Sequence, residues 1–286
     1  MSEGAALVNI GELTKPATVL IEKISDAIGG VFEPWQIRRI AEAEAEAEKI
    51  KAIKQLEITE LQHRALQRFL AEEAQKQRNI EAITGKALSQ IEDSAQPQNM
   101  EIDWITNFFD KGRLISDEDM QNLWSEVLAG EANSPGKFAK RTVNYLSSLD
   151  KYDAILFRSL CSFGWSFENV IPLIYDPQDE IYNQHNINFN SLRHLDDIGL
   201  ITFNFIGAYQ QIGLPQKGRV SYYEQVFEVE FPKEAGNVLD VGKVLLTKVG
   251  EELEPICGTE PIPGFEEYIV QRWANKFKLV VSSPNE

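Results

Sequence analysis

The sequence predicts a mainly α-helical chain with a smaller α+β part at its C-terminal end, and three observations lead to this fold class. Residues 1–36 contain apolar residues at a helical three-four spacing. Residues 37–91 are rich in Ala, Glu, Lys, Gln and Leu, and residues 100–166 repeat short amphipathic helical patterns. Over residues 167–286, short β-branched and aromatic runs alternate with turn residues, as strands do. We take these four ranges as the expected domains.

The composition limits the class of protein. The chain has 286 residues, a hydrophobic fraction of 43% and a formal net charge of −16 at pH 7. It can therefore bury ordinary cores, but it repels nucleic acid and anionic lipid. Residues 1–86 hold 12 Lys and Arg against 14 Asp and Glu, a net of −2, while the rest of the chain holds 16 against 30, a net of −14. Only the N-terminal part could approach an anionic surface at low electrostatic cost.

The expected compartment is the cytoplasm. Cys161 and Cys257 lie far apart in the sequence and neither belongs to a CxxC pair, which favours reduced, buried thiols over a disulfide framework. No run reaches the ~18 to 20 apolar residues of a membrane-spanning helix, and the N-terminus lacks the pattern of a secretory signal. A peripheral position at the inner membrane is the alternative if the N-terminal segment contacts lipid.

The first helix is predicted to begin near Thr14 as its N-cap, with Pro16 in the first turn, and to end by Pro34. Its apolar stripe consists of Leu20, Ile24, Ile28, Phe32 and Trp35. The preferred interpretation is that this stripe packs against the long helix or between subunits. The other interpretation is insertion into a membrane surface, with Arg38 and Arg39 near the head groups. The polar face of the helix is neutral rather than basic, which favours packing.

A long continuous helix is predicted over residues 37–91, which contain no proline within the helix and one late glycine, Gly85. At ~1.5 Å per residue it would be about 80 Å long. Its thin apolar seam drifts through Leu61, Ala65 and Phe69 and then fades. Such a helix cannot bury itself alone, so we expect a homo-oligomer or a protein partner. The seam residues expected to contact another helix are Ile40, Ala43, Ala47 and Ile50.

Residues 92–99 are polar and contain a proline, and they are the predicted linker and domain boundary. Beyond them, residues 102–109 have the pattern of a short amphipathic helix. Ser116 is placed to cap the next helix, Ser134 to start another and Asp150 to cap a fourth. The middle of the chain is therefore predicted to be a helical bundle.

The C-terminal region alternates between strand and helix patterns. Predicted strands are residues 170–175, 200–205 and 219–231, and predicted helices are residues 189–198, part of 244–253 and part of 261–278. The order of these elements is that of winged-helix domains. A helix is followed by a Gly-Leu-Ile turn into a strand, then by wing-like strands and a closing Leu-Thr-x-x-Gly segment. We therefore expect a winged-helix-like domain with residues 189–198 as its contact helix.

Known catalytic and metal-binding signatures do not occur in the sequence. The three histidines have no partner at metal-ligand spacing, and the chain lacks a phosphate-binding loop, a dinucleotide fingerprint and a hydrolase nucleophile elbow. We expect no metal, no cofactor and no catalytic residue, and we interpret the carboxylate clusters as helix caps. An enzyme with an unrecognised site stays open as an alternative, and its candidate residues are Asp176, Asp179, Glu180, His185 and His194.

The predicted contact helix could enter a DNA groove or bind a protein. It offers Arg193 and His194 as cationic donors beside Asp196 and Asp197, in strongly acidic surroundings. DNA binding needs several Lys or Arg side chains aimed at phosphates. Protein contact is therefore favoured over contact with nucleic acid.

Three stretches together carry a resemblance: KPATVLIEKISDAIGGVFEPWQIRRIAEAEAEAEKI from Lys15, LWSEVLAGEANSPGKFAKRTVNYLSSLDKYDAILF from Leu123, and LRHLDDIGLI with GKVLLTKVGEELEPICG from Leu192. Over nearly its whole length the chain resembles an uncharacterised bacterial family of unknown function. More loosely and in part, it resembles the alpha-type abortive-infection (Abi-alpha) proteins. These motifs carry no established catalytic residues, so no catalytic role transfers. The resemblance implies a defence context in which a bacterium limits phage replication, often at the cost of the infected cell.

The expected function is thus that of a non-enzymatic, oligomer-forming bacterial antiphage protein of the abortive-infection type. It would act through protein contacts, with contact to a membrane surface as a variant of the same hypothesis. A winged-helix, DNA-associated regulator is the first alternative, and an enzyme with an unrecognised site is the second.

Overall fold

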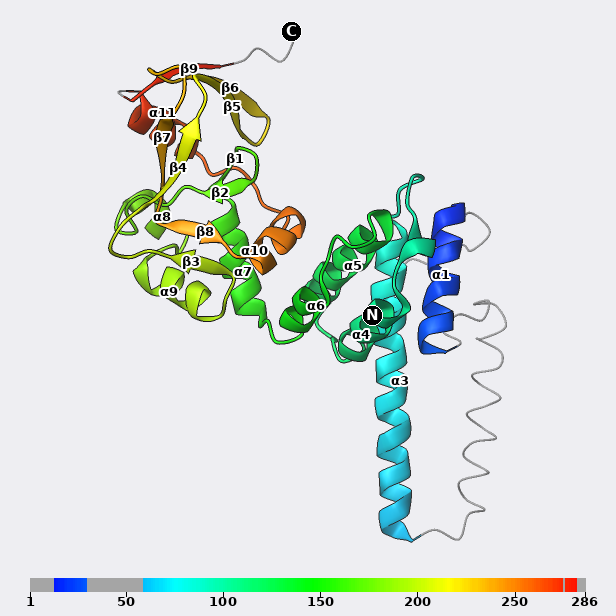
Figure 1. Cartoon of the computed structure of the whole chain (residues 1–286). Coiled ribbons are helices and arrows are strands. Elements are labelled where there is room, and N and C mark those ends of the chain that lie inside the picture. The colour runs from blue at the N-terminus through cyan, green and yellow to red at the C-terminus, as the bar shows by residue number, and fades with distance from the viewer. Residues whose placement is uncertain (1–12, 30–58, 275, 282–286) are drawn as a thin grey trace. The chain divides into compact units, whose positions relative to one another are not determined.

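The structure is a computed structural model that describes residues 13–29, 59–274 and 276–281 (Figure 1). The described chain is mainly helical with a smaller share of strand, which confirms the coarse fold class. It divides into two compact units between Ser148 and Leu149. This single division differs from the four expected domains. Of the helices that the structure describes, none is both long enough and apolar enough to cross a membrane.

Unit 1 is built from helices. Its elements are α1 (Lys15–Ile28), α3 (Glu60–Leu88), the short 3-10 helix η2 (Pro97–Asn99), α4 (Ile102–Gly112), α5 (Glu118–Asn133) and α6 (Lys140–Leu146). Helix α1 begins as predicted, because the hydroxyl of Thr14 accepts a hydrogen bond from the backbone N–H of Ala17 at 3.4 Å and Pro16 lies in the first turn. It ends at Gly29, whose φ of 80° is readily adopted by glycine.

Helix α3 begins later than predicted. Thr59 has an extended backbone and forms a capping box with Gln62: its hydroxyl accepts from the N–H of Gln62 at 3.3 Å, and the Gln62 side chain accepts from the N–H of Thr59 at 2.8 Å. This cap satisfies N–H groups that a helix start leaves without partners. The expectation of one unbroken helix over residues 37–91 is therefore wrong at Thr59. Residues 37–58 lie outside the described part of the chain.

The core of unit 1 is aromatic. Helix α4 contributes Trp104, Phe108 and Phe109, and α5 contributes Trp124. The ring of Phe108 lies 5.1 Å from that of Trp104 and 4.9 Å from that of Trp124. The indole N–H of Trp104 donates to the backbone oxygen of Phe138 at 2.7 Å, so the one polar atom of this side chain is satisfied. These contacts hold α4 against α5 and the chain that precedes α6.

Residues 92–99, where the sequence predicts a linker and a domain boundary, lie within unit 1. The backbone N–H of Gln96 donates to the carbonyl oxygen of Ala132 at 3.1 Å, and Ala95 and Pro97 are buried. Polar composition alone favoured an exposed linker. The end of α5 supplies a partner for the backbone of this segment, and packing becomes favourable once that polar group is satisfied.

The helix predicted from Ser134 begins only at Lys140. Glu131 is buried, and its carboxylate accepts hydrogen bonds from the backbone N–H groups of Gly136 at 2.7 Å and Phe138 at 2.9 Å. Because these bonds go to a side chain rather than to a helical carbonyl, the stretch before Lys140 forms a turn.

Unit 2 combines helices with three sheets. Its elements are α7 (Lys151–Cys161), β1 (Gly164–Ser166), β2 (Val170–Pro172), α8 (Glu180–Asn183), α9 (Phe189–Asp197), β3 (Ile201–Phe203), β4 (Tyr209–Leu214), β5 (Lys217–Tyr222), β6 (Gln225–Glu230), β7 (Asn237–Gly242), β8 (Val244–Leu246), α10 (Lys248–Leu253), the 3-10 helix η3 (Glu254–Ile256), α11 (Phe265–Trp273) and β9 (Lys278–Val281). One sheet has the order β2-β1-β5-β6-β9, and the pairs β3-β8 and β4-β7 form two small antiparallel sheets.

Helix α7 lies in unit 2, although the sequence places it at the end of the predicted helical bundle. Asp153 on α7 contacts His194 on α9, and the hydroxyl of Ser159 donates to the backbone oxygen of His185 at 2.7 Å. Asp150 caps this helix as predicted. The contacts of α7 with α9 and with the chain that follows α8 explain its place in the second unit.

The predicted contact helix corresponds to α9, and the strand after it to β3. Strand β3 pairs with β8, which leads into α10, so these elements follow each other in the predicted order. Between β3 and β8 the chain adds β4, β5, β6 and β7. The β5-β6 hairpin overlaps the strand region predicted over residues 219–231 and begins two residues earlier, at Lys217, but β4 and β7 are not predicted. Their sequences mix polar residues and glycine with isolated apolar residues, so only pairing with each other identifies them as strands.

The core of unit 2 surrounds Trp165 on β1. Its ring lies 5.4 Å from that of Tyr222, 5.3 Å from that of Phe227 and 5.1 Å from that of Trp273. These rings come from β5, β6 and α11. They fix the C-terminal helix and the β5-β6 hairpin against the first strand.

Candidate functional site

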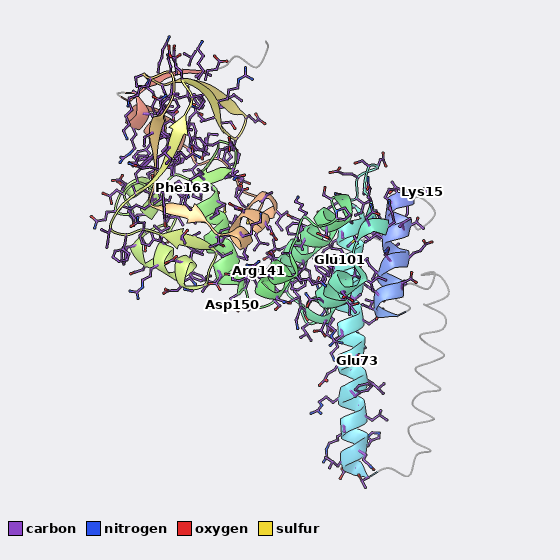
Figure 2. All side chains as sticks on the ribbon, in the orientation of Figure 1. Lys15, Glu73, Glu101, Arg141, Asp150 and Phe163 are labelled. Atoms are coloured by element: carbon purple, nitrogen blue, oxygen red, sulfur yellow. The ribbon has the colours of Figure 1, made fainter. Side chains whose placement is uncertain are left out.

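The first part of α3 projects from the rest of unit 1. Every residue from 60 to 78 is exposed or partly exposed, and Asn79 is the first buried residue of the helix. Figure 1 shows α3 continuing beyond α1 and α4, and in Figure 2 the side chains before Glu73 meet no other described segment. We call residues 60–78 the projecting half of α3.

An apolar stripe runs along the projecting half. Leu61 is 68% exposed and Phe69 is 56% exposed, whereas Leu66 and Leu70 are partly exposed. We define the α3 stripe as Leu61, Ala65, Leu66, Phe69 and Leu70. Large apolar side chains in such a row on a helix are typical of a surface that contacts another helix.

The α3 stripe lies on the face of α3 that packs in unit 1. Ala65 and Ile83 are 18 residues apart, as are Phe69 and Ala87, and this spacing is about five turns of an α-helix. Ile83 and Ala87 are fully buried. This face of α3 is therefore covered by the rest of unit 1 from Asn79 onward. In the projecting half, no described residue covers it.

Exposed ion pairs also run along the projecting half. Arg64 lies 3.6 Å from Glu60, and Arg68 lies 3.4 Å from Glu72, each pair joining residues one turn apart. Exposed pairs of this kind contribute only about 0.3–0.5 kcal/mol each. They stabilise the projecting half weakly, so burial of the α3 stripe would be the larger source of stability.

A cleft lies at the base of the projecting half, between α3, α4 and the end of α1. Its volume is about 280 Å³, and its walls include Ile28, Lys76, Ile80, Phe109 and Arg113. Small-molecule sites typically have roughly 300–1,000 Å³ and are more enclosed. This open cleft is better suited to one or two side chains of a protein partner than to a buried ligand.

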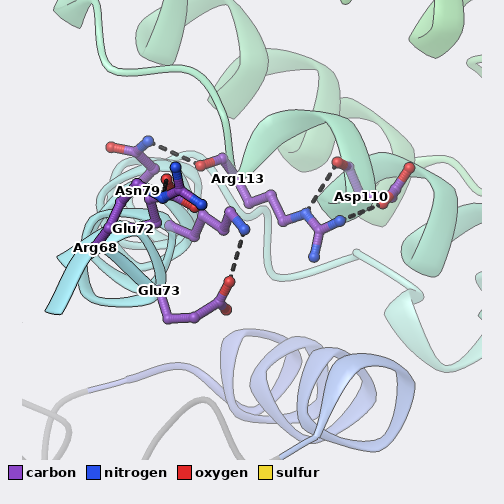
Figure 3. A network of polar contacts seen from close by, with 7 residues as sticks. Arg68, Glu72, Glu73, Asn79, Asp110 and Arg113 are labelled. Atoms are coloured by element: carbon purple, nitrogen blue, oxygen red, sulfur yellow. Dashed lines mark hydrogen bonds and ion pairs between the residues drawn. The ribbon is translucent and has the colours of Figure 1, made fainter. Parts of the chain in front are cut away.

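Charged side chains around the cleft are paired (Figure 3). Lys76 Nζ lies 2.6 Å from Glu73 Oε1, and the guanidinium of Arg113 lies 2.7 Å from Asp110 Oδ1. The hydrogen bond from Lys111 and the charges of Lys111 and Arg113 lower the pKa of Asp110. The neighbouring cations therefore favour the charged form of Asp110, and the cleft can offer both signs of charge to a partner.

Asn79 joins the projecting half to the bundle. Its side-chain N–H₂ donates to the backbone oxygen of Arg113 at 2.9 Å (Figure 3). It also donates to Ser116 Oγ at 3.2 Å. Its side-chain oxygen accepts from Gln75 at 2.9 Å and from Gln121 at 3.5 Å. This polar link fixes α3 relative to the end of α4.

The structure places two members of the predicted N-terminal stripe in the core. Leu20 and Ile24 are fully buried where α1 packs on α4 and η2, and Ile28 borders the cleft. The side chains of Leu20 and Ile24 therefore contact protein and have no free surface for lipid. Six further predicted residues lie outside the described part of the chain: Phe32, Trp35, Ile40, Ala43, Ala47 and Ile50.

The predicted contact helix has its cations paired within unit 2. Arg193 lies 3.7 Å from Asp197, one turn along α9, and His194 Nε2 lies 2.6 Å from Asp153 Oδ1 on α7. The pair with Asp153 positions His194 partly exposed beside the ring of Tyr152, at 6.2 Å between ring centres. The surface around α9 therefore offers little uncompensated positive charge.

The candidate residues for an unrecognised enzyme each have a hydrogen-bond or ring partner in unit 2. Asp179 accepts a hydrogen bond from the hydroxyl of Tyr268 at 2.6 Å, and Asp176 accepts from the backbone N–H of Gln178 at 3.0 Å. The ring of His185 lies against that of Phe163. Glu180 accepts from Gln184, as expected for a helix start, and His194 pairs with Asp153. Within the described ranges, no three His, Cys, Asp or Glu side chains could hold a metal ion together.

Sequence reasoning missed Leu66 and Leu70, because the predicted seam followed the drift through Ala65 and Phe69. The Thr-x-x-Gln capping box at residues 59–62 was the signal that could have divided the long helix correctly. It also missed the charged residues of the cleft. No local signal identifies them, since they come together only where α3 crosses α4.

The chain belongs to the DUF2806 family, which is described as a protein of unknown function and whose profile matches residues 63–270. The match begins within the projecting half of α3 and ends in α11. No curated protein is similar enough to match. No solved structure matches either.

Proposed function

We propose that this protein is a non-enzymatic, oligomer-forming bacterial antiphage protein of the abortive-infection type, and that two copies assemble through the α3 stripe. The observation that carries the assembly is the exposure of Leu61 and Phe69 on the face of α3 that is buried further along the same helix. The defence context is supported by the resemblance to the Abi-alpha proteins. Membership of a family of unknown function is compatible with it.

A second copy is the occupant that fits the stripe best. In an antiparallel pairing of two α3 helices, Leu66 of each copy can face Phe69 of the other, and Ala65 can face Leu70. In the same register Arg64 of one copy comes beside Glu72 of the other, so charges of opposite sign meet at the edge of the contact. A twofold arrangement of this kind uses the same surface on both copies.

The α3 stripe alone is short for a stable dimer. At ~1.5 Å per residue it spans about 15 Å, while stable interfaces bury about 1,200–2,000 Å² in total. We therefore include the predicted seam at Ile40, Ala43, Ala47 and Ile50 in the proposed assembly surface.

The assembly is tested by light scattering of the full-length protein at micromolar concentration. We expect a mass about twice the 32.4 kDa of one chain. Replacement of Phe69 by Glu should give a monomer, because it introduces a charge into the centre of the contact. Gln67→Glu is the matched control, since Gln67 is exposed on the opposite side of the same turn and should keep the dimer. A monomeric wild-type protein, or a dimer that is unchanged by Phe69→Glu, would refute the assembly.

Residues 30–58 of the same copy are the competing occupant of the stripe, and cross-linking separates the two outcomes. On a background with Cys161→Ser and Cys257→Ser, one variant carries Leu66→Cys and a second carries Phe69→Cys, and oxidation of a mixture of the two should give a product with the mass of two chains that contains one copy of each. Absence of this mixed product would contradict assembly between copies.

The defence role is tested by phage plating. Cells that express the wild-type protein should reduce plaque formation, and Phe69→Glu should abolish the reduction while Gln67→Glu keeps it. If both variants protected the cells equally, defence would not depend on assembly through the α3 stripe. No protection by the wild-type protein against a broad phage panel would count against the defence role itself.

A winged-helix regulator is the second candidate, and the order α9, β3, β8, α10 is the observation that favours it. It predicts binding to duplex DNA that weakens steeply with salt and is reduced by Arg193→Ala. Because Arg193 already lies 3.7 Å from Asp197, the expected affinity is low. Absence of duplex binding at low salt would remove this candidate.

A further inference from the structure

A groove in unit 2 follows one side of strand β5. Its volume is about 460 Å³, and its opposite wall is β4 from Gln211 to Leu214. Four buried apolar residues form its floor, namely Val220, Val229, Phe231 and Leu239. Ile212 on β4 adds an apolar rim that is 76% exposed. Phe167 and Glu168, which follow the last residue of β1, also line the groove, so it lies on the β1 side of β5.

The side of β5 that borders the groove has no strand beside it over most of its length. Strand β6 pairs with β5 from Lys217 to Tyr222, whereas β1 pairs with β5 only at Ser221, opposite Ser166. The backbone groups of successive residues point to opposite sides of a strand, so those of Lys217 and Arg219 point to the same side as those of Ser221. In the described part of the chain, no strand pairs with β5 on that side before Ser221. These backbone groups are therefore placed to bond an added strand.

The opposite wall, β4, is less suited to further pairing. Its register with β7 is irregular at two places, and at the second of them Gly213, between Ile212 and Leu214, has a φ of 77°. Such irregularities twist an edge strand away from new partners. The side-chain N–H₂ of Asn237 donates to the backbone oxygens of Leu214 at 3.2 Å and Pro215 at 3.3 Å, which fixes the end of this wall. The regular edge of β5 is therefore the one that can accept a strand.

Charges on the exposed face of this sheet alternate across its strands. One row is Lys278 on β9, Glu230 on β6 and Lys217 on β5, and Lys278 Nζ lies 3.8 Å from Glu230 Oε2. In the next row, the guanidinium of Arg219 lies 3.5 Å from Glu228 on β6. Both rows end in a cation on the free side of β5. Because opposite charges are favourable between directly opposed residues, acidic residues fit the next positions beyond Lys217 and Arg219.

Gly218 leaves space on the groove side between these two positions. A Cβ at Gly218 would meet no atom within 4 Å, and Gly218 pairs with Val229 of the floor. A large apolar side chain on an added strand would cover Gly218 and contact the floor. The side-chain oxygen of Gln211 is buried and has no hydrogen-bond partner among the described residues. A backbone N–H on the far side of the added strand would be a suitable donor for this oxygen.

We propose that this groove binds an extended segment of a partner protein, which adds an antiparallel strand to β5. The segment carries a large apolar residue opposite Gly218 and acidic residues opposite Lys217 and Arg219. Its direction follows from the sheet, in which each described strand pair is antiparallel. A main chain fits this edge because only an extended backbone supplies N–H and C=O groups at the spacing of alternate residues. The site lies in unit 2 and does not depend on assembly through the α3 stripe.

The test measures binding of a fluorescein-labelled probe peptide, Ser-Thr-Glu-Phe-Glu-Thr-Ser, to the full-length protein by fluorescence anisotropy. We expect saturable binding, and replacement of phenylalanine in the probe by serine should weaken it by about tenfold. N-methylation of both glutamate nitrogens should abolish binding, because in antiparallel pairing these nitrogens donate to β5. No saturable binding of the probe, or equal binding of the N-methylated probe, would overturn the proposal.

Charge reversal locates the probe on β5. Lys217→Glu should weaken binding by about fivefold. A probe with lysine in place of both glutamates should bind this variant more tightly than it binds the wild-type protein. Lys278→Glu is the matched control, since it reverses a charge in the same row at the other edge of the sheet and should leave binding unchanged. Equal weakening by the two variants would contradict docking on β5.

Hydrogen exchange and light scattering separate the possible occupants. With the probe bound, the amide of Arg219 should exchange more slowly, while that of Gly218, which faces β6, should change little. Unchanged exchange at Arg219 would place the probe elsewhere and refute the added strand. If Lys217→Glu changed the mass of the protein in light scattering without any probe, a second copy of the chain would occupy the groove, and a partner segment would be the wrong occupant.

Discussion

Replacement of Asn79 by Ala tests how the projecting half of α3 is joined to the bundle. Asn79 is 3% exposed and donates to the backbone oxygen of Arg113 at 2.9 Å. The variant leaves this carbonyl without its partner, and a buried polar group that loses its hydrogen bond costs about 1–3 kcal/mol. Of the other partners of Asn79, Ser116 and Gln75 are exposed and can bond to water instead, and Gln121 keeps its bond to Ile115 at 2.9 Å, so the loss is confined mainly to one group. We expect a fall of about 2 kcal/mol in the free energy of unfolding.

The assay is thermal unfolding followed by circular dichroism, with hydrogen exchange to assign the transition to unit 1. For a unit of this size, about 2 kcal/mol lowers the midpoint by roughly 4–8 °C, and amides at the end of α4 should exchange faster. Gln75→Ala is the control, because it removes an exposed partner of Asn79 on the same helix and should cost less than about 0.5 kcal/mol. Equal effects of the two variants, or an unchanged midpoint for Asn79→Ala, would refute the reasoning.

Further predictions concern the glycines and the tyrosines. A side chain at Gly250 would place Cβ 2.3 Å from the backbone oxygen of Leu200, so Gly250→Ala should destabilise unit 2 by at least about 2 kcal/mol in urea unfolding. Gly85 in α3 has open space around it, so Gly85→Ala should stabilise unit 1 by about 0.5–1 kcal/mol, and a loss there would contradict the helix-propensity argument. Burial and the hydrogen bond to Asp179 raise the pKa of Tyr268 to about 12. The unfolded chain releases this proton near pH 10, so the stability that Tyr268 contributes is complete below about pH 10 and is lost as the pH rises toward 12. Urea midpoints measured across this range should fall less steeply in Tyr268→Phe.

Local signals identified the starts of several elements. Thr14 and Pro16 marked the beginning of α1, Asp150 marked that of α7, and α9 lies within one residue of its predicted range. Each of these signals acts through hydrogen bonds or backbone angles within four residues of the chain. A helix start can therefore be read without knowing what the helix packs against.

The capping box at Thr59 is also a local signal for a helix start. The prediction passed over it, because the composition on both sides of Thr59 is uniformly typical of a helix. Propensity summed over a long window predicts helix and does not detect one residue with an extended backbone. The same limit explains why no helix begins at Ser134, where the sequence predicts one. Helix propensity favours a helix there, but the buried carboxylate of Glu131 on the preceding helix accepts the backbone N–H groups that follow Ser134.

The sequence by itself determined the helical and mixed parts of the chain, the amphipathic α1, and the expectation that a thin apolar seam on α3 needs a partner. Tertiary structure alone decided that residues 92–99 pack within unit 1 and that β4 and β7 pair. The reason is the range of the interactions: caps and amphipathic spacing act within one or two helical turns. Strand pairing and burial of a polar loop depend on segments that lie tens of residues apart and meet only once the fold has formed.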